Sequence, residues 1–187
     1  MEIILNYNVD WFYKKSKYLI EIYIEQEELM AKIKNVTTYK GIAKFYFEKI
    51  IETIINIGDL KVGKKTILDF GCGHGVLKKK LPNINVINYD IIQELSDIVF
   101  WNKYDFDFVV ANTVFYTFSS DELEQLLCDF KNKNPRLRLI VGMSRQSILN
   151  KIGKNILGFS DAHDGTLLRP QEELNVLKKY MEIINHK

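Results

Sequence analysis

Residues 66–90 read TILDFGCGHGVLKKKLPNINVINYD, two short apolar runs separated by a turn that is rich in glycine. The first run, Thr66 to Phe70, predicts a buried strand, and Val76 to Leu81 predicts a short helix that ends at a proline. Asn85 to Tyr89 predicts a second strand. Between the first strand and the helix lie three glycines, Gly71, Gly73 and Gly75. The stretch is therefore expected to fold as a strand, a tight turn, a helix and a strand.

The geometry of such a unit points to a ligand site. Parallel strands end along one edge of their sheet, and ligands bind in the crevice at that edge. Glycines in the turn allow a ligand to approach the backbone closely. Asp90 follows the second strand, where its carboxylate is placed to accept hydrogen bonds from the two hydroxyls of a ribose.

The spacing of the glycines separates two cofactor classes. In the dinucleotide fingerprint G-x-G-x-x-G the third glycine would fall at position 76, which is Val76 here. The pattern D-F-G-C-G-H-G, with Asp69 before the first glycine, instead resembles motif I of the class I S-adenosylmethionine-dependent methyltransferases, in particular small members of the type 11-like kind. The resemblance covers the range from Thr66 to Ser144.

The resemblance implies a role for each matching residue. The backbone of the glycine turn would face the methionine part of S-adenosyl-L-methionine, and Asp69 would assist at its amino group. Asp90 would hold the ribose, and the strand DFVVANT would end at the methyl-donor side. Asp97 and Ile98 would lie near the adenine, although Asp97 is equally read as a solvent-exposed charge at a helix end. The implied cofactor-binding residues are Asp69, Gly71, Cys72, Gly73, Gly75, Asp90, Ile91, Asp97, Ile98, Asn112 and Thr113.

Methyl transfer depends mainly on aligning the acceptor with an already activated methyl group, and a hydroxyl acceptor also profits from a general base. The catalytic candidates are Tyr116, where many relatives carry a histidine, and His163, with Asp164 beside it. Each has a plainer alternative, since Tyr116 could simply pack and a loop histidine is more often a hydrogen-bonding group. No metal site is predicted, because Asp161, His163 and Asp164 crowd one loop without a second cluster.

The predicted fold class is α/β, a Rossmann-like doubly wound and mostly parallel sheet of reduced size with N-terminal helices. Only Ile91 to Asp105 separates Asp90 from the next strand, which is too short for a crossover helix and a full third strand. The family's strands two, one, four and five should therefore lie in that spatial order, and the usual terminal hairpin has no room. Further strands are expected at Phe106 to Asn112, Leu137 to Met143 and Met181 to Ile184. Further helices are expected at Val9–Lys34, Tyr39–Ile57, Asp121–Lys131, Arg145–Leu157 and Gln171–Tyr180, with a loop at Phe159–Arg169.

Length and composition favour one domain. A chain of 187 residues that is 47% hydrophobic can bury one sizeable core, so residues 1–187 are read as a single methyltransferase-like domain with a helical cap (1–60) and an α/β core (61–187). The net charge of +2 disfavours nucleic acid as a partner. Two cysteines without metal spacing and no apolar stretch of membrane-spanning length favour a soluble, cytoplasmic protein without a membrane partner. A homodimer is one candidate assembly.

The leading functional hypothesis is an enzyme that transfers a methyl group from S-adenosyl-L-methionine to a small-molecule, sugar or lipid-linked acceptor. The stretch Asn112-Thr113-Val114 lacks the Asn-Pro-Pro-aromatic motif of many amino-group methyltransferases, which lowers the case for a base or glutamine acceptor. A second hypothesis is a non-catalytic S-adenosylmethionine-binding or interaction protein on a degenerated scaffold. A nicotinamide enzyme is third, disfavoured by Val76. Aromatic residues near the N-terminus, such as Trp11 and Tyr18, could line an acceptor pocket or belong to a helix core.

Overall fold

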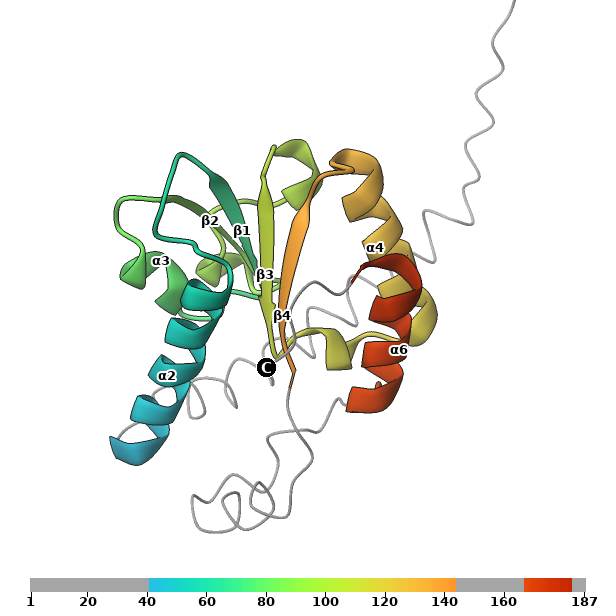
Figure 1. Ribbon diagram of the computed structural model, residues 1–187, viewed down its shortest axis with the longest axis horizontal. Coiled ribbons are helices and arrows are strands. Elements are labelled where there is room, and N and C mark those ends of the chain that lie inside the picture. The colour runs from blue at the N-terminus through green and yellow to red at the C-terminus, as the bar shows by residue number, and fades with distance from the viewer. Residues whose placement is uncertain (1–40, 144–166, 183–187) are drawn as a thin grey trace, which may run out of the picture. The chain divides into compact units, whose positions relative to one another are not determined.

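The computed structural model describes residues 41–143 and 167–182, and within them one parallel sheet carries the fold (Figure 1). Its strands are β1 (Thr66–Phe70), β2 (Asn85–Tyr89), β3 (Phe108–Asn112) and β4 (Arg138–Gly142). Their spatial order is β2-β1-β3-β4, and every pair is parallel. The predicted α/β class and strand order are confirmed.

The two central strands, β1 and β3, are buried on both sides, which explains why they read as nearly continuous apolar runs. Successive side chains point to opposite faces. Ile67 of β1 and Val110 of β3 belong to one core cluster, while Leu68 and Val109 belong to the other. Two layers of helix are therefore needed to cover the sheet.

Helices α2 (Gly41–Ile57) and α3 (Val76–Lys80) cover the first face. Helix α2 ends directly before Gly58 and Asp59. Asp59 adopts a left-handed φ of 48°, and the Leu60 N–H donates to the Ile55 carbonyl at 2.9 Å. This is a Schellman arrangement, in which two backbone bonds satisfy the last carbonyls of the helix.

Helices α4 (Ser120–Lys133) and α6 (Pro170–Tyr180) cover the second face. Ser119 caps α4, because its Oγ accepts from the Glu122 N–H while the Glu122 carboxylate accepts from the Ser119 N–H at 2.8 Å. Such a capping box satisfies two orphan donors of the first turn. Pro170 opens α6 at its first position, where a missing N–H costs nothing.

The connection between β2 and β3 contains two 3₁₀ turns, η1 (Gln93–Leu95) and η2 (Trp101–Lys103), and no strand. The open edge of β2 is instead covered by Asp97, whose N–H donates to the Asn88 carbonyl and whose carboxylate accepts from the Asn88 N–H at 2.7 Å. Trp101 packs in the adjoining core, and its ring centroid lies 4.8 Å from that of Phe130. One residue, Asp97, thus supplies two hydrogen bonds that a neighbouring strand would otherwise make.

Some predictions fall partly or wholly outside the described residues. Outside the described residues lie the helices expected at 9–34 and 145–157, most of the loop at 159–169, and residues 1–40 of the predicted cap (1–60). The domain division therefore stays a prediction. Met181 and Glu182 are described and are not in a strand, contrary to expectation, because the Met181 N–H closes α6 on the Leu177 carbonyl. Within the two described ranges, no helix is long and apolar enough to span a membrane.

Candidate functional site

The glycine turn after β1 has the conformation that its sequence predicts. Gly71, Gly73 and Gly75 all have positive φ, at 73°, 49° and 63°. A Cβ on Gly71 would lie 2.3 Å from Val114 Cγ2, and one on Gly75 would lie 2.7 Å from Asn88 Nδ2. A Cβ on Gly73 would meet nothing within 4 Å. The backbone at Gly73 therefore borders open space, while its neighbours are packed.

Asp90 is fixed beside this turn. Its Oδ2 accepts from the Gly73 N–H at 2.9 Å and its Oδ1 accepts from the Ile92 N–H at 3.0 Å. Because a carboxylate has about four acceptor positions, each oxygen retains capacity for a further donor. Ile91, the next residue, is 63% exposed, so an apolar side chain lies directly beside the carboxylate.

Three polar side chains lie on one face of the sheet near its carboxyl edge. Asp69 is paired in register with Asn88 on one side and Val110 on the other, so Asn112 shares that face two residues further on. Burial, and second the charge of Asp90, raise the pKa of Asp69 to about 7. The Oδ1 atoms of Asn88 and Asn112 are buried and have no hydrogen-bond partner among the residues that the structure describes.

Unpaired amide oxygens are costly in a protein interior, where the great majority of polar groups are satisfied. The two oxygens lie on one face of the sheet, on the strands either side of Asp69, whose pKa is raised to about 7. A cationic or N–H-bearing ligand would supply hydrogen-bond donors to such groups. The sequence did not predict the buried amide oxygen of Asn88, because Asn88 appears there as a single polar residue in a buried strand.

Thr113, the first residue beyond β3, is also unusual. Its φ is 56°, a left-handed conformation that is uncommon for a β-branched residue. The Thr113 N–H donates to the Gly142 carbonyl at 2.7 Å, and its hydroxyl donates to the Asn112 carbonyl at 2.6 Å. Strain of this kind persists where the surroundings enforce it, often at functional sites. Asn112 and Thr113 thus lie at the carboxyl end of β3, the edge of the sheet where the sequence predicts a ligand site.

The side chain of Cys72 makes its contacts within the protein. It is buried, its thiol donates to the Leu95 carbonyl at 3.3 Å, and burial raises its pKa. A neutral thiol of this kind is not a nucleophile at neutral pH. Cys72 therefore ties the glycine turn to η1, and only its backbone remains for a ligand.

Asp97 and Ile98 have contacts of their own within the protein, and the adenine contacts that the resemblance implies for them stay a prediction. The Asp97 carboxylate accepts from Lys78 Nζ at 2.8 Å as well as from the Asn88 N–H. Burial alone would raise the pKa of Asp97, but these two donors lower it. Ile98 is 7% exposed and packs in the core with Phe106 and its neighbours. Both side chains are engaged in holding the loop, and Ile91 is the more exposed apolar residue here.

The three lysines of α3 are also engaged. Lys78 pairs with Asp97, Lys79 donates to the His74 carbonyl at 2.8 Å, and Lys80 lies 3.4 Å from Glu52. The two carboxylate pairs are partly exposed, so each adds little stability. All three ammonium groups are therefore engaged in contacts within the protein.

Of the two catalytic candidates, the structure describes only Tyr116. His163 lies outside the described residues. Tyr116 lies in the 3₁₀ turn η3 (Phe115–Thr117) and is half-buried. Burial, and then the charge of Glu173, raise the pKa of Tyr116, so its hydroxyl stays protonated and suits hydrogen-bond donation better than proton abstraction.

Glu173 was missed by sequence reasoning. It is 3% exposed, and burial raises its pKa to about 7. Helical periodicity could have predicted its burial, because Glu173 precedes Val176 and Leu177 by three and four positions and so shares their buried helical face. Within the described residues, no group of three or more His, Cys, Asp or Glu side chains is placed to hold a metal ion.

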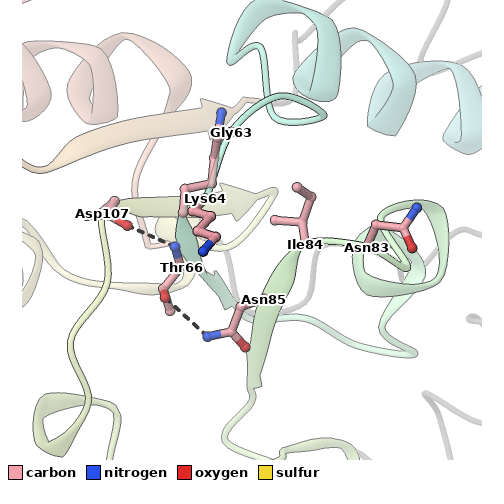
Figure 2. Close-up of a pocket in the computed structure, with 8 residues that line it drawn as sticks. Gly63, Lys64, Thr66, Asn83, Ile84, Asn85 and Asp107 are labelled. Carbon is pink, nitrogen blue, oxygen red and sulfur yellow. Dashed lines mark hydrogen bonds between the residues drawn. The ribbon is translucent and has the colours of Figure 1, made fainter.

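A cavity of about 380 Å³ lies at the opposite, amino edge of the sheet (Figure 2). Its polar groups are paired with one another, since Asp107 Oδ2 accepts from the Thr66 N–H at 2.8 Å and Asn85 Nδ2 donates to Thr66 Oγ1 at 3.1 Å. Ligands of parallel α/β sheets bind at the carboxyl edge. This cavity is therefore a surface hollow beside these hydrogen bonds, and the candidate site is the carboxyl edge of the sheet at the glycine turn, Asp90 and Thr113.

Comparison with known proteins bears on the fold. The sequence matches no protein-family model and no curated protein sequence. Its structure is similar to the crystal structure of a SAM-dependent methyltransferase from Archaeoglobus fulgidus, with a TM-score of 0.51 and 17% identity over 71% of this chain and 67% of that chain. The chain therefore has a methyltransferase-like Rossmann fold, while the type 11-like subfamily and the roles of individual residues stay predictions.

Proposed function

We propose that the protein is an S-adenosyl-L-methionine-dependent methyltransferase acting on a small-molecule, sugar or lipid-linked acceptor. The observation that carries the proposal is the carboxyl edge of the sheet, where the backbone at Gly73 borders open space and two buried amide oxygens meet no hydrogen-bond donor among the described residues. The fold likeness supports the same class. When bound, the cofactor supplies an activated methyl group on a sulfonium.

The residues present fit this cofactor group by group. Asn112 and Asn88 offer unpaired acceptors of the kind that an ammonium group requires, with Asp69 beside Asn88. The carboxylate of Asp90 is held in place by two backbone N–H groups and can accept from ribose hydroxyls. The exposed Ile91 offers apolar surface for an adenine ring.

The protein's own contribution would be orientation. Asp90 is fixed by the Gly73 and Ile92 N–H groups, and Thr113 is held by the Gly142 carbonyl, so neither needs to reorganise on binding. Holding donor and acceptor in line converts a bimolecular reaction into an effectively unimolecular one, a gain of up to about 7 to 11 kcal/mol. The absent Asn-Pro-Pro-aromatic motif favours acceptors other than a base or glutamine amide.

Calorimetric titration with S-adenosyl-L-methionine, S-adenosylhomocysteine and NAD in parallel tests the proposal. Both sulfur compounds should bind with one site per chain, and NAD should give no binding heat. Binding of NAD alone would contradict the proposal and favour a nicotinamide enzyme.

A non-catalytic binding protein is the second candidate, and the reduced sheet favours it. In the described residues β2 is an edge strand with no third strand beside it. Transfer of labelled methyl from the cofactor into a cell extract, compared with the Asp90→Ala variant, separates the two functions. Cofactor binding with incorporation no higher than that of the variant would favour the non-catalytic protein.

A further inference from the structure

Asp90, the residue proposed to bind the ribose, follows directly on an edge strand. A residue of such a strand directs its backbone N–H and C=O groups either to the neighbouring strand or to the open side, in alternation. The Tyr89 carbonyl is on the inner side, where it accepts from the Gly71 N–H at 2.8 Å. The backbone groups of Asn88 and Asp90, one position to either side, are therefore directed outward. Within the described residues no strand lies there, so another part of the chain must hold them.

The side chain of Ser96 supplies the partner for Asp90. Its Oγ accepts from the Asp90 N–H at 3.2 Å and from the Ile98 N–H at 3.4 Å. Its O–H donates to the Ile98 carbonyl at 2.6 Å, and the Asn88 carbonyl lies further away at 3.3 Å. A serine hydroxyl has one donor and two acceptor positions, so these bonds use all of them. Ser96 is thus oriented by Ile98 while it holds the backbone of Asp90.

The carboxylate of Asp90 closes the same loop from the other side. Its Oδ1 accepts from the Ile92 N–H at 3.0 Å, which is the arrangement of an Asx turn, and its Oδ2 accepts from the Gly73 N–H at 2.9 Å. The Ser96 N–H donates to the Gln93 carbonyl at 3.1 Å and so returns the chain toward Asp90. The loop from residue 90 to residue 96 is therefore closed at one end by a carboxylate and at the other by a hydroxyl.

The residues on either side of Ser96 anchor this loop to two other parts of the structure. The Leu95 carbonyl accepts from the Cys72 thiol of the glycine turn at 3.3 Å. The Asp97 carboxylate accepts from Lys78 Nζ of α3 at 2.8 Å. The hydroxyl of Ser96 is therefore placed by contacts of its own loop, and it provides a fixed point for the residue that it holds.

We propose that Ser96 is a positioning residue of the cofactor site, whose hydroxyl holds the backbone of Asp90 where the Asp90 carboxylate can bind the ribose. The inference rests on the proposed function and adds to it a residue that acts through Asp90. Removal of the hydroxyl takes away the acceptor of the Asp90 N–H and loosens the end of β2. The carboxylate must then be ordered when the cofactor binds, and this ordering lowers the affinity.

A double-mutant cycle tests the inference, because it separates an effect that passes through Asp90 from a general loss of stability. Calorimetry measures the affinity for S-adenosylhomocysteine of the full-length wild type, Ser96→Ala, Asp90→Ala and the double variant. Ser96→Ala should lower the affinity about 2- to 10-fold, the range expected for one hydrogen bond between neutral groups. In the Asp90→Ala background the same substitution should have no further effect, because the carboxylate that it positions is absent.

Two further variants separate the hydroxyl of Ser96 from its surroundings. Ser96→Thr keeps the hydroxyl, and the backbone here is extended, with φ of −96° and ψ of 140°, which suits a β-branched residue. Its affinity should equal that of the wild type. Ser119→Ala removes the hydroxyl that caps α4 on the second face of the sheet, so it should lower the melting temperature without changing the affinity.

Three results would overturn the inference while leaving the proposed function in place. The first is equal affinity of the wild type and Ser96→Ala, and the second is an equal effect of Ser96→Ala with and without the Asp90 carboxylate. The third is an affinity of Ser96→Thr as low as that of Ser96→Ala, which would show that the hydroxyl is not responsible. If the wild type itself fails to bind S-adenosylhomocysteine, the proposed function fails and the inference fails with it.

Discussion

The two edges of the sheet are built from the same parallel strands but differ in how their polar groups are satisfied. At the amino edge, Asp107, Thr66 and Asn85 hydrogen-bond to one another. At the carboxyl edge, two buried amide oxygens have no partner within the described part of the chain, and Thr113 is held in a left-handed conformation. Because folding alone penalises such features, their concentration at one edge indicates that this edge is built for a ligand.

The largest effect is expected when one methyl group is added at each edge of the sheet. Gly71 and Gly63 both have positive φ, but a Cβ on Gly71 meets Val114 at 2.3 Å whereas one on Gly63 meets nothing within 4 Å. Gly63→Ala should cost only the conformational penalty, about 1 to 2 kcal/mol. Gly71→Ala should add an overpacking cost of about 1 to 3 kcal/mol and abolish S-adenosylhomocysteine binding.

Chemical denaturation of both variants measures the difference in the free energy of unfolding. Equal destabilisation would show that the glycine turn is not packed as described. Retained binding in Gly71→Ala would show that the turn does not border the ligand.

The next largest effect is expected at Asp90. Asp90→Ala removes an acceptor for ribose hydroxyls, and losing hydrogen bonds to a charged group costs about 1.5 to 3 kcal/mol, or roughly 10- to 150-fold in affinity. Asp105→Ala, at an exposed carboxylate that lies 3.3 Å from Lys133, is the matched control and should leave affinity unchanged. Calorimetry with S-adenosylhomocysteine measures both, and unchanged affinity in a folded Asp90→Ala protein would place the ribose elsewhere.

A third prediction concerns pH, because Asp69 and Glu173 both have pKa values raised to about 7. Above their unfolded pKa values, near 4, the folded protein keeps protons that the unfolded chain has lost. Stability should therefore fall as the pH rises from about 5 to 7, by at most about 1.4 kcal/mol per pH unit for each group, and level off above that.

The carboxyl groups with lowered pKa, such as Glu122 and Asp97, titrate below this window and act in the opposite direction. Asp69→Asn and Glu173→Gln should each flatten the decline, and the double variant should remove it. Denaturation midpoints between pH 5 and 8 check this. A decline that neither substitution changes would show that other groups cause it.

The smallest effect is expected for two exposed apolar side chains, one at each edge of the sheet. Ile91 and Val62 are 63% and 62% exposed, and they lie on loops at opposite edges of the sheet. Ile91→Ser should weaken S-adenosylhomocysteine binding by a few-fold, because the adenine ring loses apolar contact, at about 25 cal/mol per Å². Val62→Ser should have no effect on binding. Both should change stability by less than about 0.5 kcal/mol, and equal affinities would remove Ile91 from the site.

Much of the fold could be predicted from the sequence because its signals are local. The runs at 66–70 and 85–89, the glycine turn between them, and the short connection after Asp90 each restrict the local geometry and so determine strand order. The Ser119 cap and the Pro170 helix start are also local signals. Their structural outcomes agree with the prediction to within a few residues at each end.

The features that escaped prediction depend on which loop packs on which strand. Asp97 became the hydrogen-bonding edge of β2, and Ile98 turned into the core, because the missing third strand left that edge to be covered. The unpaired oxygen of Asn88 is apparent only when its neighbour Asp69 and the glycine turn are in place. Glu173 was within reach of a helical-periodicity argument, but its position beside Tyr116 was not.

Amide hydrogen exchange with and without S-adenosylhomocysteine tests the central claim most directly, because it locates the ligand at one edge or the other. If the ligand binds at the carboxyl edge, exchange should become slower at Gly71–Gly75, at Asp90–Ile92 and at Thr113. Exchange at residues 63–66 and 83–85 of the amino edge should not change. Protection confined to the amino edge, or no protection at either edge at saturating ligand, would contradict it.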